Sequence, residues 1–249
     1  MRAKPICRVA NLLIEIGNTA LKAAWADGIT LGKTFRYQGE KNFDFIESLT
    51  AKEKAGTMVV ASSVVISPAE EAILRQGCRH LLILDKDHQD ILRDNALPSY
   101  LSYDRAASII ACKYLFRDRG VTIVDFGTTI SVDFINASGV FEGGNISVGC
   151  RTRFKALNRY SRSLPLVNTP DESPETGHSI ISSIEAGVIS GIMFEIEGYL
   201  EKYPDNIPVF TGGDANYFAK RMKNSIFVIC NLVLMGLAII AERYADKEN

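Results

Sequence analysis

Two six-residue segments of the chain, 110 positions apart, share one pattern. Residues 14–19 read Ile-Glu-Ile-Gly-Asn-Thr, and residues 124–129 read Val-Asp-Phe-Gly-Thr-Thr. Each segment closes an apolar run typical of a buried strand and leads into a second strand, which ends in a turn at Asp27-Gly28 or Ser138-Gly139. A repeat at this spacing predicts an α/β protein of two similar halves, residues 1–119 and 120–249, with a cleft between them.

The residue types in these two turns suit a bound phosphate. Glycine lets the backbone approach a ligand closely and adopt positive φ. Successive backbone N–H groups and the hydroxyl of Thr19 or Thr129 can donate to phosphate oxygens. A carboxylate just before the turn, Glu15 or Asp125, can hold a metal ion that neutralises the phosphates. Two such turns would bind a nucleoside triphosphate from both sides. Two β-hairpins whose turns contain glycine but bind no ligand would have the same sequence pattern.

A third glycine-rich loop reads Thr211-Gly212-Gly213-Asp214. It follows a short apolar run at 209–210 and precedes a helix-like segment. Because glycine carries no side chain, a flat adenosine can lie against the backbone there. The loop indicates a nucleotide only in combination with the two repeated turns.

Composition narrows the possible partners. The chain has 249 residues, of which 47% are hydrophobic and 23% charged, as in globular proteins that bury a sizeable core. With 28 basic and 29 acidic residues the formal net charge is 28 − 29 = −1, so no overall positive field attracts nucleic acid. One basic cluster fits either a local anionic contact or a solvated helix face: Arg151, Arg153, Lys155, Arg159 and Arg162. The five cysteines include no Cys-x-x-Cys pair, which favours a reduced, cytoplasmic compartment.

One stretch is nearly as apolar as a membrane-spanning helix. Residues 226–241 are nearly all apolar, but the stretch has 16 residues, and a spanning helix needs about 20. We expect instead a buried strand at 225–230, followed by a helix that Asn231 caps. The sequence therefore predicts no membrane contact.

Hydrophobic periodicity and turn residues predict the other elements. Strands are expected at 11–16, 19–26, 57–63, 81–84, 121–126, 131–136 and 140–146, with a further strand beginning near residue 30. Helices are expected at 43–50, 68–76 and 104–116, and Asp104 would cap the last of these.

Several motifs, in this order along nearly the whole chain, resemble those of type III pantothenate kinases, within the superfamily of acetate kinase, sugar kinases, Hsp70 and actin. The matching residues are Glu15, Gly17, Asn18, Thr19 and Lys22; Ser102, Tyr103, Asp104 and Arg105; Asp125, Gly127, Thr128 and Thr129; Gly143 to Gly149; Leu164 to Val167; and Thr211 to Ala215. The resemblance implies two actin-like or ribonuclease H-like halves with ATP bound between them.

The resemblance also implies a reaction, which is the transfer of the ATP γ-phosphate to the primary hydroxyl of pantothenate, the first step of coenzyme A synthesis. Asp104 would be the general base, and Arg105 would bind the pantothenate carboxylate, which suits a guanidinium fork. Glu15 and Asp125 would organise the cations, Mg2+ with ATP and a monovalent cation, K+ or NH4+. The family further implies a cytoplasmic homodimer with the substrate site near the dimer interface.

Two sets of binding residues follow from the resemblance. Substrate-binding positions would be Arg105, Ser102, Tyr103, Asn95 and Ser179. ATP-binding positions would be Glu15, Gly17, Asn18, Thr19, Lys22, Gly127, Thr128, Thr129, Gly212 and Gly213.

The chain departs from the family pattern at Glu15 (Asp in the family), Ser102 (Gly), Val148 (Pro) and Asn95 (Tyr). The extra methylene of Glu15 moves the carboxylate by about 1 Å, and a misplacement of that size can cost about 10²-fold in rate. Three readings therefore stay open: a pantothenate kinase with full or reduced activity, another small-molecule kinase of the superfamily, and a catalytically impaired nucleotide-binding or regulatory dimer.

Overall fold

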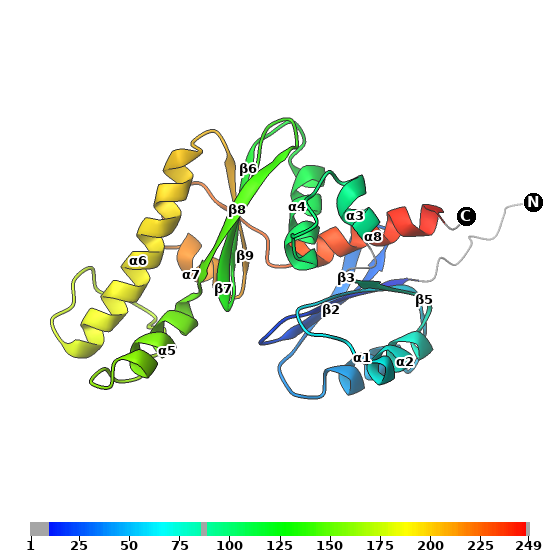
Figure 1. Cartoon of the computed structure of the whole chain (residues 1–249), viewed down its shortest axis with the longest axis horizontal. Helices are drawn as coiled ribbons and strands as arrows, with labels where there is room; N and C mark the ends of the chain where they lie inside the picture. The colour runs from blue at the N-terminus through cyan, green and yellow to red at the C-terminus, as the bar shows by residue number, and fades with distance from the viewer. Residues whose placement is uncertain (1–9, 86–88, 248–249) are drawn as a thin grey trace, which may run out of the picture. The chain divides into compact units, whose positions relative to one another are not determined.

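The first half of the chain contains a five-stranded mixed sheet (Figure 1). The computed structural model describes residues 10–85 and 89–247. The sheet has the order β3-β2-β1-β4-β5, from β1 (Asn11–Ile16), β2 (Leu21–Asp27), β3 (Thr30–Tyr37), β4 (Ala55–Ser62) and β5 (Cys78–Leu84). β1, β2 and β3 form an antiparallel meander, whereas β4 and β5 run parallel to β1.

The second half repeats this topology strand for strand. Its sheet has the order β8-β7-β6-β9-β10, from β6 (Val121–Phe126), β7 (Thr129–Ile135), β8 (Phe141–Val148), β9 (Ile207–Gly212) and β10 (Phe227–Val228). Again the first three strands form an antiparallel meander and the last two are parallel to the first. The prediction of two similar α/β halves is confirmed.

Eight helices within the described residues complete the two halves: α1 (Asn42–Thr50), α2 (Pro68–Gln76), α3 (Gln89–Asp94), α4 (Tyr103–Leu115), α5 (Cys150–Tyr160), α6 (Ile180–Lys202), α7 (Ala215–Ala219) and α8 (Leu232–Lys247). The helix expected at 68–76 has the predicted bounds. Ser67 caps it by accepting from the Glu70 N–H, and the Glu70 carboxylate accepts from the Ser67 N–H in return.

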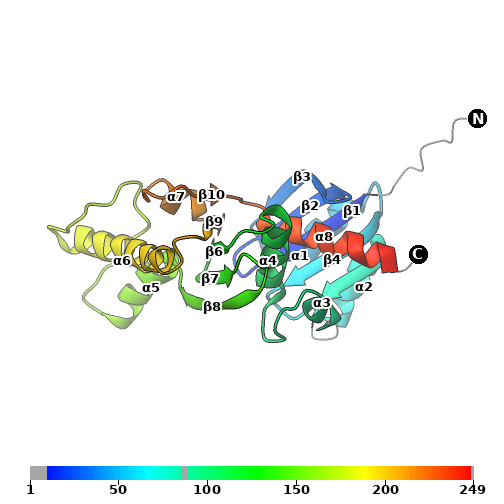
Figure 2. The ribbon, with the colours of Figure 1, turned by 90° about the horizontal axis from the view of Figure 1, so that it is seen from above.

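The chain divides into two compact units, and their boundaries differ from the expected division at residue 120. One unit runs to Tyr114 and resumes at Leu232, and the other is Leu115–Asn231. The reason is α8, which packs against β1 and β4 of the first sheet although it closes the chain (Figure 2). The expected strand at 225–230 is only two residues long, as β10, and α8 begins directly after Asn231. No helix in the described ranges is long and apolar enough to cross a membrane.

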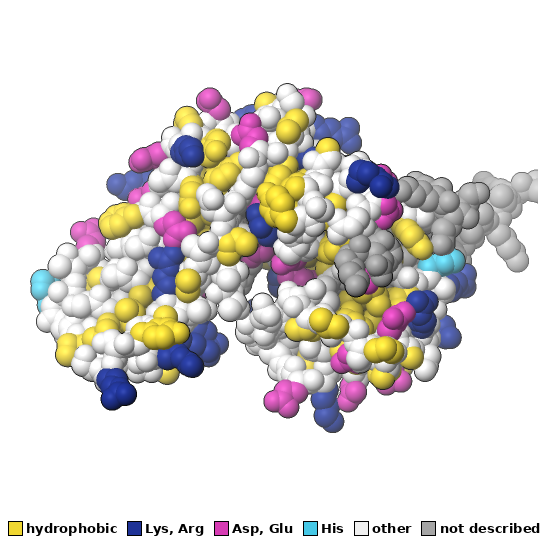
Figure 3. Space-filling view, viewed as in Figure 1, with side chains coloured by type: hydrophobic (Ala, Val, Ile, Leu, Met, Phe, Trp, Pro, Cys, Tyr) yellow, Lys and Arg dark blue, Asp and Glu magenta, His cyan; other side chains and the backbone are white. Residues whose placement is uncertain are grey.

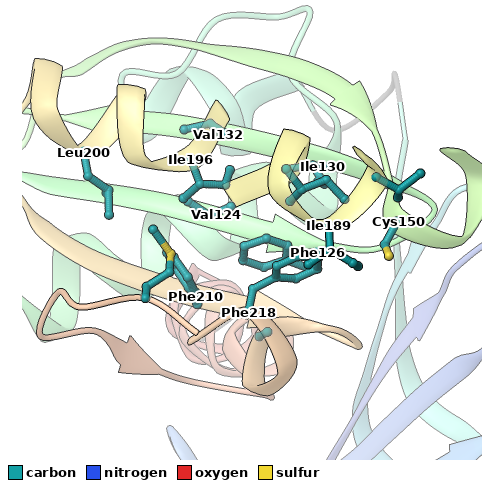
Figure 4. Close-up of a cluster of buried hydrophobic side chains, with 14 of the residues drawn as sticks. Val124, Phe126, Ile130, Val132, Cys150, Ile189, Ile196, Leu200, Phe210 and Phe218 are labelled. Carbon is teal, nitrogen blue, oxygen red and sulfur yellow. The ribbon is translucent and has the colours of Figure 1, made fainter. Parts of the chain in front are cut away.

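The core of the second unit lies between its sheet and α6. Phe126 packs edge-on against Phe210, with ring centroids 4.9 Å apart, and stacks on Phe218 at 5.0 Å. Figure 4 shows Ile189 and Ile196 of α6 directed into the same cluster. Because Phe126 ends β6 just before Gly127, and Phe210 lies two residues before Gly212, this packing helps to fix the positions of both glycine-rich loops.

Candidate active site

The first repeated turn joins β1 to β2. Ile16 pairs with Leu21, so four residues, 17–20, form the turn. The Gly17 N–H donates to the Ala20 carbonyl at 3.0 Å, which closes the loop. Asn18 and Thr19 at its tip are exposed. The turn thus presents backbone N–H groups and a hydroxyl to solvent, as a phosphate-binding loop requires.

Glu15 and Lys22 face each other across the strands that lead into this turn. They are cross-strand partners, and Lys22 Nζ lies 3.3 Å from Glu15 Oε2. Oε2 is buried and lies in an ion pair with Lys22 that falls short of ordinary hydrogen-bond geometry. Burial raises the pKa of the Glu15 carboxyl; Lys22 opposes that rise, and the negative charge of Asp104 adds to it. The turn therefore has a buried carboxylate whose charge is balanced by Lys22.

Asp104 lies near this turn, as its effect on the Glu15 carboxyl shows. The helix α4 begins at Tyr103, so Asp104 is in the first turn and the prediction that it caps the helix is wrong. Its Oδ1 accepts the Arg105 N–H at 2.9 Å. A carboxylate is favourable here because the N-terminal end of a helix carries partial positive charge. Glu15 and Asp104 thus lie in the same unit, near enough for their charges to interact, and their assignment to one site stays a prediction.

The two residues before Asp104 have separate roles. Tyr103 donates its hydroxyl to the Asp85 carbonyl, which ties α4 to the end of β5. Ser102 is exposed, and its carbonyl accepts the Ala106 N–H at 2.9 Å. Tyr103 therefore anchors the helix that carries Asp104, while the Ser102 side chain stays open to solvent.

Asn95 contacts two cationic side chains. Its carbonyl accepts from Lys113 Nζ at 2.9 Å, and its side-chain oxygen accepts from Arg243 Nη1 at 2.6 Å. Lys113 follows Asp104 by nine residues in the same helix, about 13 Å along the axis. Burial lowers the pKa of Lys113, and Arg243 lowers it further. Asn95 thus joins α3, α4 and α8. A substrate contact by Asn95 stays a prediction.

The second repeated turn is one residue shorter than the first. Phe126 pairs with Ile130, so three residues, 127–129, form the turn, and the Gly127 N–H donates to the Thr129 carbonyl at 3.0 Å. All three turn residues are exposed. Asp125 stands in register with Ser131 on one side and Thr211 on the other, both buried. The equivalent carboxylates, Glu15 and Asp125, therefore occupy the same position of the central strand in the two sheets.

Two glycines pack directly on this second turn. A Cβ on Gly149 would lie 2.1 Å from the Gly127 carbonyl oxygen, and a Cβ on Gly212 would lie 2.4 Å from Asp125 Oδ1. Gly212 also has φ +91, a conformation that only glycine adopts readily. A Cβ on Gly213 would meet nothing closer than 4.0 Å. The structure therefore explains Gly149 and Gly212 by close packing and leaves Gly213 facing open space.

Ser179 begins the long helix α6. Its hydroxyl accepts the Ser182 N–H at 3.2 Å, and Ser182 returns the contact in a capping box. This role in helix capping accounts for a hydroxyl residue at the position. A substrate contact by Ser179 stays a prediction.

A broad apolar groove lies between α5 and α6, and the sequence analysis did not predict it. Its volume is about 1090 Å³. The lining residues are Ser147, Val148, Arg153, Ala156, Leu157, Tyr160, Ser161, Leu164, Ile180, Ser183, Ile184, Gly187 and Val188. We call this surface the α5–α6 groove. Figure 3 shows hydrophobic and basic side chains next to each other over α5. The charge inside the groove is neutralised, because Arg153 pairs with Glu195.

Within residues 10–85 and 89–247, no three His, Cys, Asp or Glu side chains gather as a metal cage. Glu15 and Asp125 each offer a carboxylate beside a phosphate-type turn instead. Mg2+ commonly binds through one or two carboxylates together with substrate phosphates and waters. Glu15 fits this mode of binding, because its buried Oε2 has no hydrogen bond of ordinary geometry from the described residues.

Comparison with known proteins gives consistent matches. A family model described as type III pantothenate kinase matches residues 11–202. A protein of that name from Phocaeicola vulgatus is 35% identical over 250 residues, covering 95% of this chain and 99% of its own. Another from Cytophaga hutchinsonii is 35% identical over 232 residues, covering 91% and 96%. Among solved structures, the activator of 2-hydroxyisocaproyl-CoA dehydratase from Clostridium difficile, with bound ADPNP, superposes with a TM-score of 0.57 at 12% identity, covering 96% of each chain. That last likeness concerns the fold.

Proposed function

Since the chain belongs to the type III pantothenate kinase family and catalyses ATP-dependent phosphorylation of pantothenate in coenzyme A biosynthesis, we propose that Asp104 is the general base of this reaction. The observation that carries the proposal is the position of Asp104. It stands in the first turn of α4, close enough to the phosphate-type turn for its charge to act on Glu15. An acceptor hydroxyl bound there would meet a carboxylate and a phosphate-binding loop together.

The reaction is a phosphoryl transfer from ATP to a hydroxyl group. The carboxylate of Asp104 takes the proton from the primary hydroxyl of pantothenate, and that oxygen forms a bond to the γ-phosphorus. The bond from this phosphorus to the β–γ bridging oxygen breaks, and ADP leaves with the electron pair. Such reactions depend on positioning and charge neutralisation more than on covalent help from the protein. A correctly placed base contributes about 10²–10⁴-fold.

Arg105 is the proposed anchor for the pantothenate carboxylate. A guanidinium can bind a carboxylate through two parallel hydrogen bonds. A cation is unfavourable in the first turn of a helix, because it opposes the helix dipole. The presence of Arg105 directly after Asp104 is therefore better explained by ligand binding than by stability of α4. Ser102, which is exposed at the same helix end, is the second proposed contact, and Tyr103 holds the helix in place.

ATP is assigned to the glycine-rich loops. The backbone of Gly17, Asn18 and Thr19, with Lys22, would bind phosphate oxygens from the first unit. Gly127, Thr128 and Thr129 would do so from the second unit, and Gly212-Gly213 would lie against the adenosine. The support is that both turns are exposed and are closed by their own backbone hydrogen bonds.

Glu15 and Asp125 are the proposed ligands of the cations, Mg2+ with ATP and a monovalent ion, K+ or NH4+. When bound, the divalent ion would neutralise charge on the transferring phosphate. The residues present fit such ions, since Glu15 keeps a buried oxygen without a hydrogen-bond donor. Lys22 pairs with this same oxygen, so the cation and the lysine would share the charge of the carboxylate.

The α5–α6 groove supports a homodimer. Exposed apolar side chains on and around it include Tyr160 at 84%, Ile180 at 60% and Phe194 at 71% exposure. Contiguous apolar surface of this kind on a soluble protein marks an interaction site. We assign a second copy of the chain as the occupant, in line with the family resemblance. A cytoplasmic location is proposed with it, because the sparse cysteines include no Cys-x-x-Cys pair and those among the described residues form no disulfide.

Replacing Asp104 by Asn tests the proposal. Asn keeps the size of the side chain but cannot accept the proton. We expect kcat to fall by about 10²–10⁴-fold, with the dissociation constants of ATP and pantothenate, measured by calorimetry, changed little. An Asp104→Asn enzyme of near-normal kcat would overturn the assignment of the base.

A further inference from the structure

The segment between β4 and α2 presents two aliphatic side chains to solvent. Val65 is 95% exposed and Val64 is 49% exposed. Single exposed apolar residues are common on protein surfaces. This pair is different because the backbone that carries it is held in place on both sides.

Hydrogen bonds fix the segment to the phosphate-type turn. The Ser63 N–H donates to the carbonyl of Ile16, at 2.9 Å, immediately before Gly17. The Ser62 hydroxyl donates to the Val64 carbonyl at 2.7 Å and accepts the Val64 N–H at 3.1 Å. At the other end, Ser67 caps α2. Val side chains also have restricted χ1 rotation, so the two valines form a preorganised apolar surface.

This surface lies at the edge of the sheet that carries the catalytic groups. β1 and β4 are parallel and end together, with Ile16 in register with Ser62. The first phosphate-type turn leaves from this edge, and the charge of Asp104 acts on Glu15 there.

The other exposed large apolar side chains of the first unit, among the described residues, are Ile29, Tyr100 and Tyr114. Ile29 lies in the β2–β3 turn, which is at the opposite edge of the sheet, because Asn11 at the start of β1 pairs with Ala26. Tyr114 lies at the far end of α4, ten residues after Asp104. Tyr100 carries a polar hydroxyl. Val64 and Val65 are therefore the exposed aliphatic side chains at the catalytic edge.

Pantothenate has an apolar group close to its reacting hydroxyl. The carbon that bears the phosphorylated hydroxyl of pantothenate is bonded to a quaternary carbon with two methyl groups. A hydroxyl bound at Asp104 therefore brings both methyls to the same edge of the sheet. We propose that Val64 and Val65 form the apolar wall that receives these methyl groups and so determine specificity for pantothenate. The proposal rests on the proposed role of Asp104 as base.

Two substrates that differ in these methyl groups test whether Val64 and Val65 determine specificity. One is pantothenate, and the other is the analogue in which hydrogens replace both methyl groups. A methyl-sized group in an apolar site is worth about tenfold or more in kcat/KM, so the unaltered enzyme should prefer pantothenate by at least about tenfold. Val64→Thr with Val65→Thr keeps the shape but places hydroxyls against the methyls. In this variant the preference should fall to about twofold or less, through loss of activity on pantothenate alone.

Ile29→Thr is the matched control, an exposed aliphatic residue at the opposite edge, and should keep the full preference. An unchanged preference in the double valine variant would overturn the proposal. If the unaltered chain phosphorylates neither compound, the assigned reaction fails instead, and calorimetric binding of the same two compounds then decides on the valines. Equal affinity of the unaltered chain for pantothenate and for the analogue would also overturn the proposal.

Discussion

At the scale of single residues, the most unusual feature is the buried ion pair of Glu15 and Lys22. The carboxylate is buried, and its charge is balanced by the ammonium group of Lys22. Removing a partner from such a pair leaves the other charge poorly solvated. Glu15 keeps the negative charge of the aspartate in the family motif and pairs with Lys22. The substitution is therefore compatible with a working site.

Glu15 should make stability depend on pH. Burial raises the pKa of its carboxyl in the folded protein, so the folded state binds more protons than the unfolded state above pH about 4.5. Stability from this group is then lost as the pH rises through that range, with a slope of at most about 1.4 kcal/mol per pH unit. Glu15→Gln removes this slope. Urea unfolding of both proteins from pH 4 to pH 8 should show the unaltered protein losing stability relative to the variant, and parallel curves would contradict this.

Sequence reasoning at this scale identified residue types but not their neighbours. Asp104, Glu15 and Lys22 were found by motif, and the structure places them in one unit. Asn95 was assigned to the substrate by its spacing from Asp104, yet the structure uses its oxygens to hold Lys113 and Arg243. Spacing along the chain does not reveal which helix end a loop residue will pack against. Ser63 and Val65 carried no motif, and only the pairing of β4 with β1 brings them to the site.

At the scale of elements, the close crossing of α4 and α8 is the most constrained contact. A Cβ on Gly236 would lie 1.9 Å from the Ala107 carbonyl oxygen. Since that oxygen belongs to the backbone of a buried helix, α8 would have to move as a whole. The glycine therefore sets the distance between these two helices and, through α4, supports the position of Asp104.

Gly236→Ala should accordingly lower the free energy of unfolding by about 1–3 kcal/mol, the usual cost of overpacking. Gly198→Ala is the matched control, because that glycine lies within α6 and a Cβ there would meet nothing within 4 Å. Relief of glycine's helix penalty should raise stability by about 0.5–1 kcal/mol. Equilibrium unfolding in urea measures both. Equal midpoints for the two variants would contradict the proposed close packing.

Most elements followed from local signals, and the exceptions have physical reasons. The capping box of α2 and the alternating strands around both turns are encoded within a few residues. β10 was expected to be longer, because an apolar run shows burial but does not show where strand pairing stops. The two turns read alike in sequence but differ by one residue in length, since strand register, and not the motif, sets where pairing resumes.

At the scale of the whole molecule, duplication explains the architecture and α8 is the exception to it. Two sheets of identical topology follow from the repeat at residues 14 and 124. The placement of α8 in the first unit could not be predicted, because its apolar surface matches any open sheet face. The α5–α6 groove was also missed, since exposed apolar residues on a helix look like core residues in sequence.

The groove should control oligomeric state. We expect the unaltered protein to sediment as a dimer and Tyr160→Ser with Ile180→Ser to sediment at the mass of one chain, because two exposed apolar contacts are replaced by polar ones. Val140→Ser changes a residue that is 54% exposed in the β7–β8 turn, outside the groove, and should remain dimeric. Analytical ultracentrifugation at micromolar concentration distinguishes these states. A dimer that persists in the double variant would place the interface elsewhere.

The most direct test of the account is pantothenate-dependent release of ADP by the purified chain, measured with Mg2+ and ATP, with and without K+. The account predicts ADP release that requires pantothenate, is stimulated by K+, yields 4′-phosphopantothenate in equal amount, and is lost in Asp104→Asn. A chain that binds both ATP and pantothenate but releases no ADP would contradict it and would identify a binding protein that has lost its catalytic step.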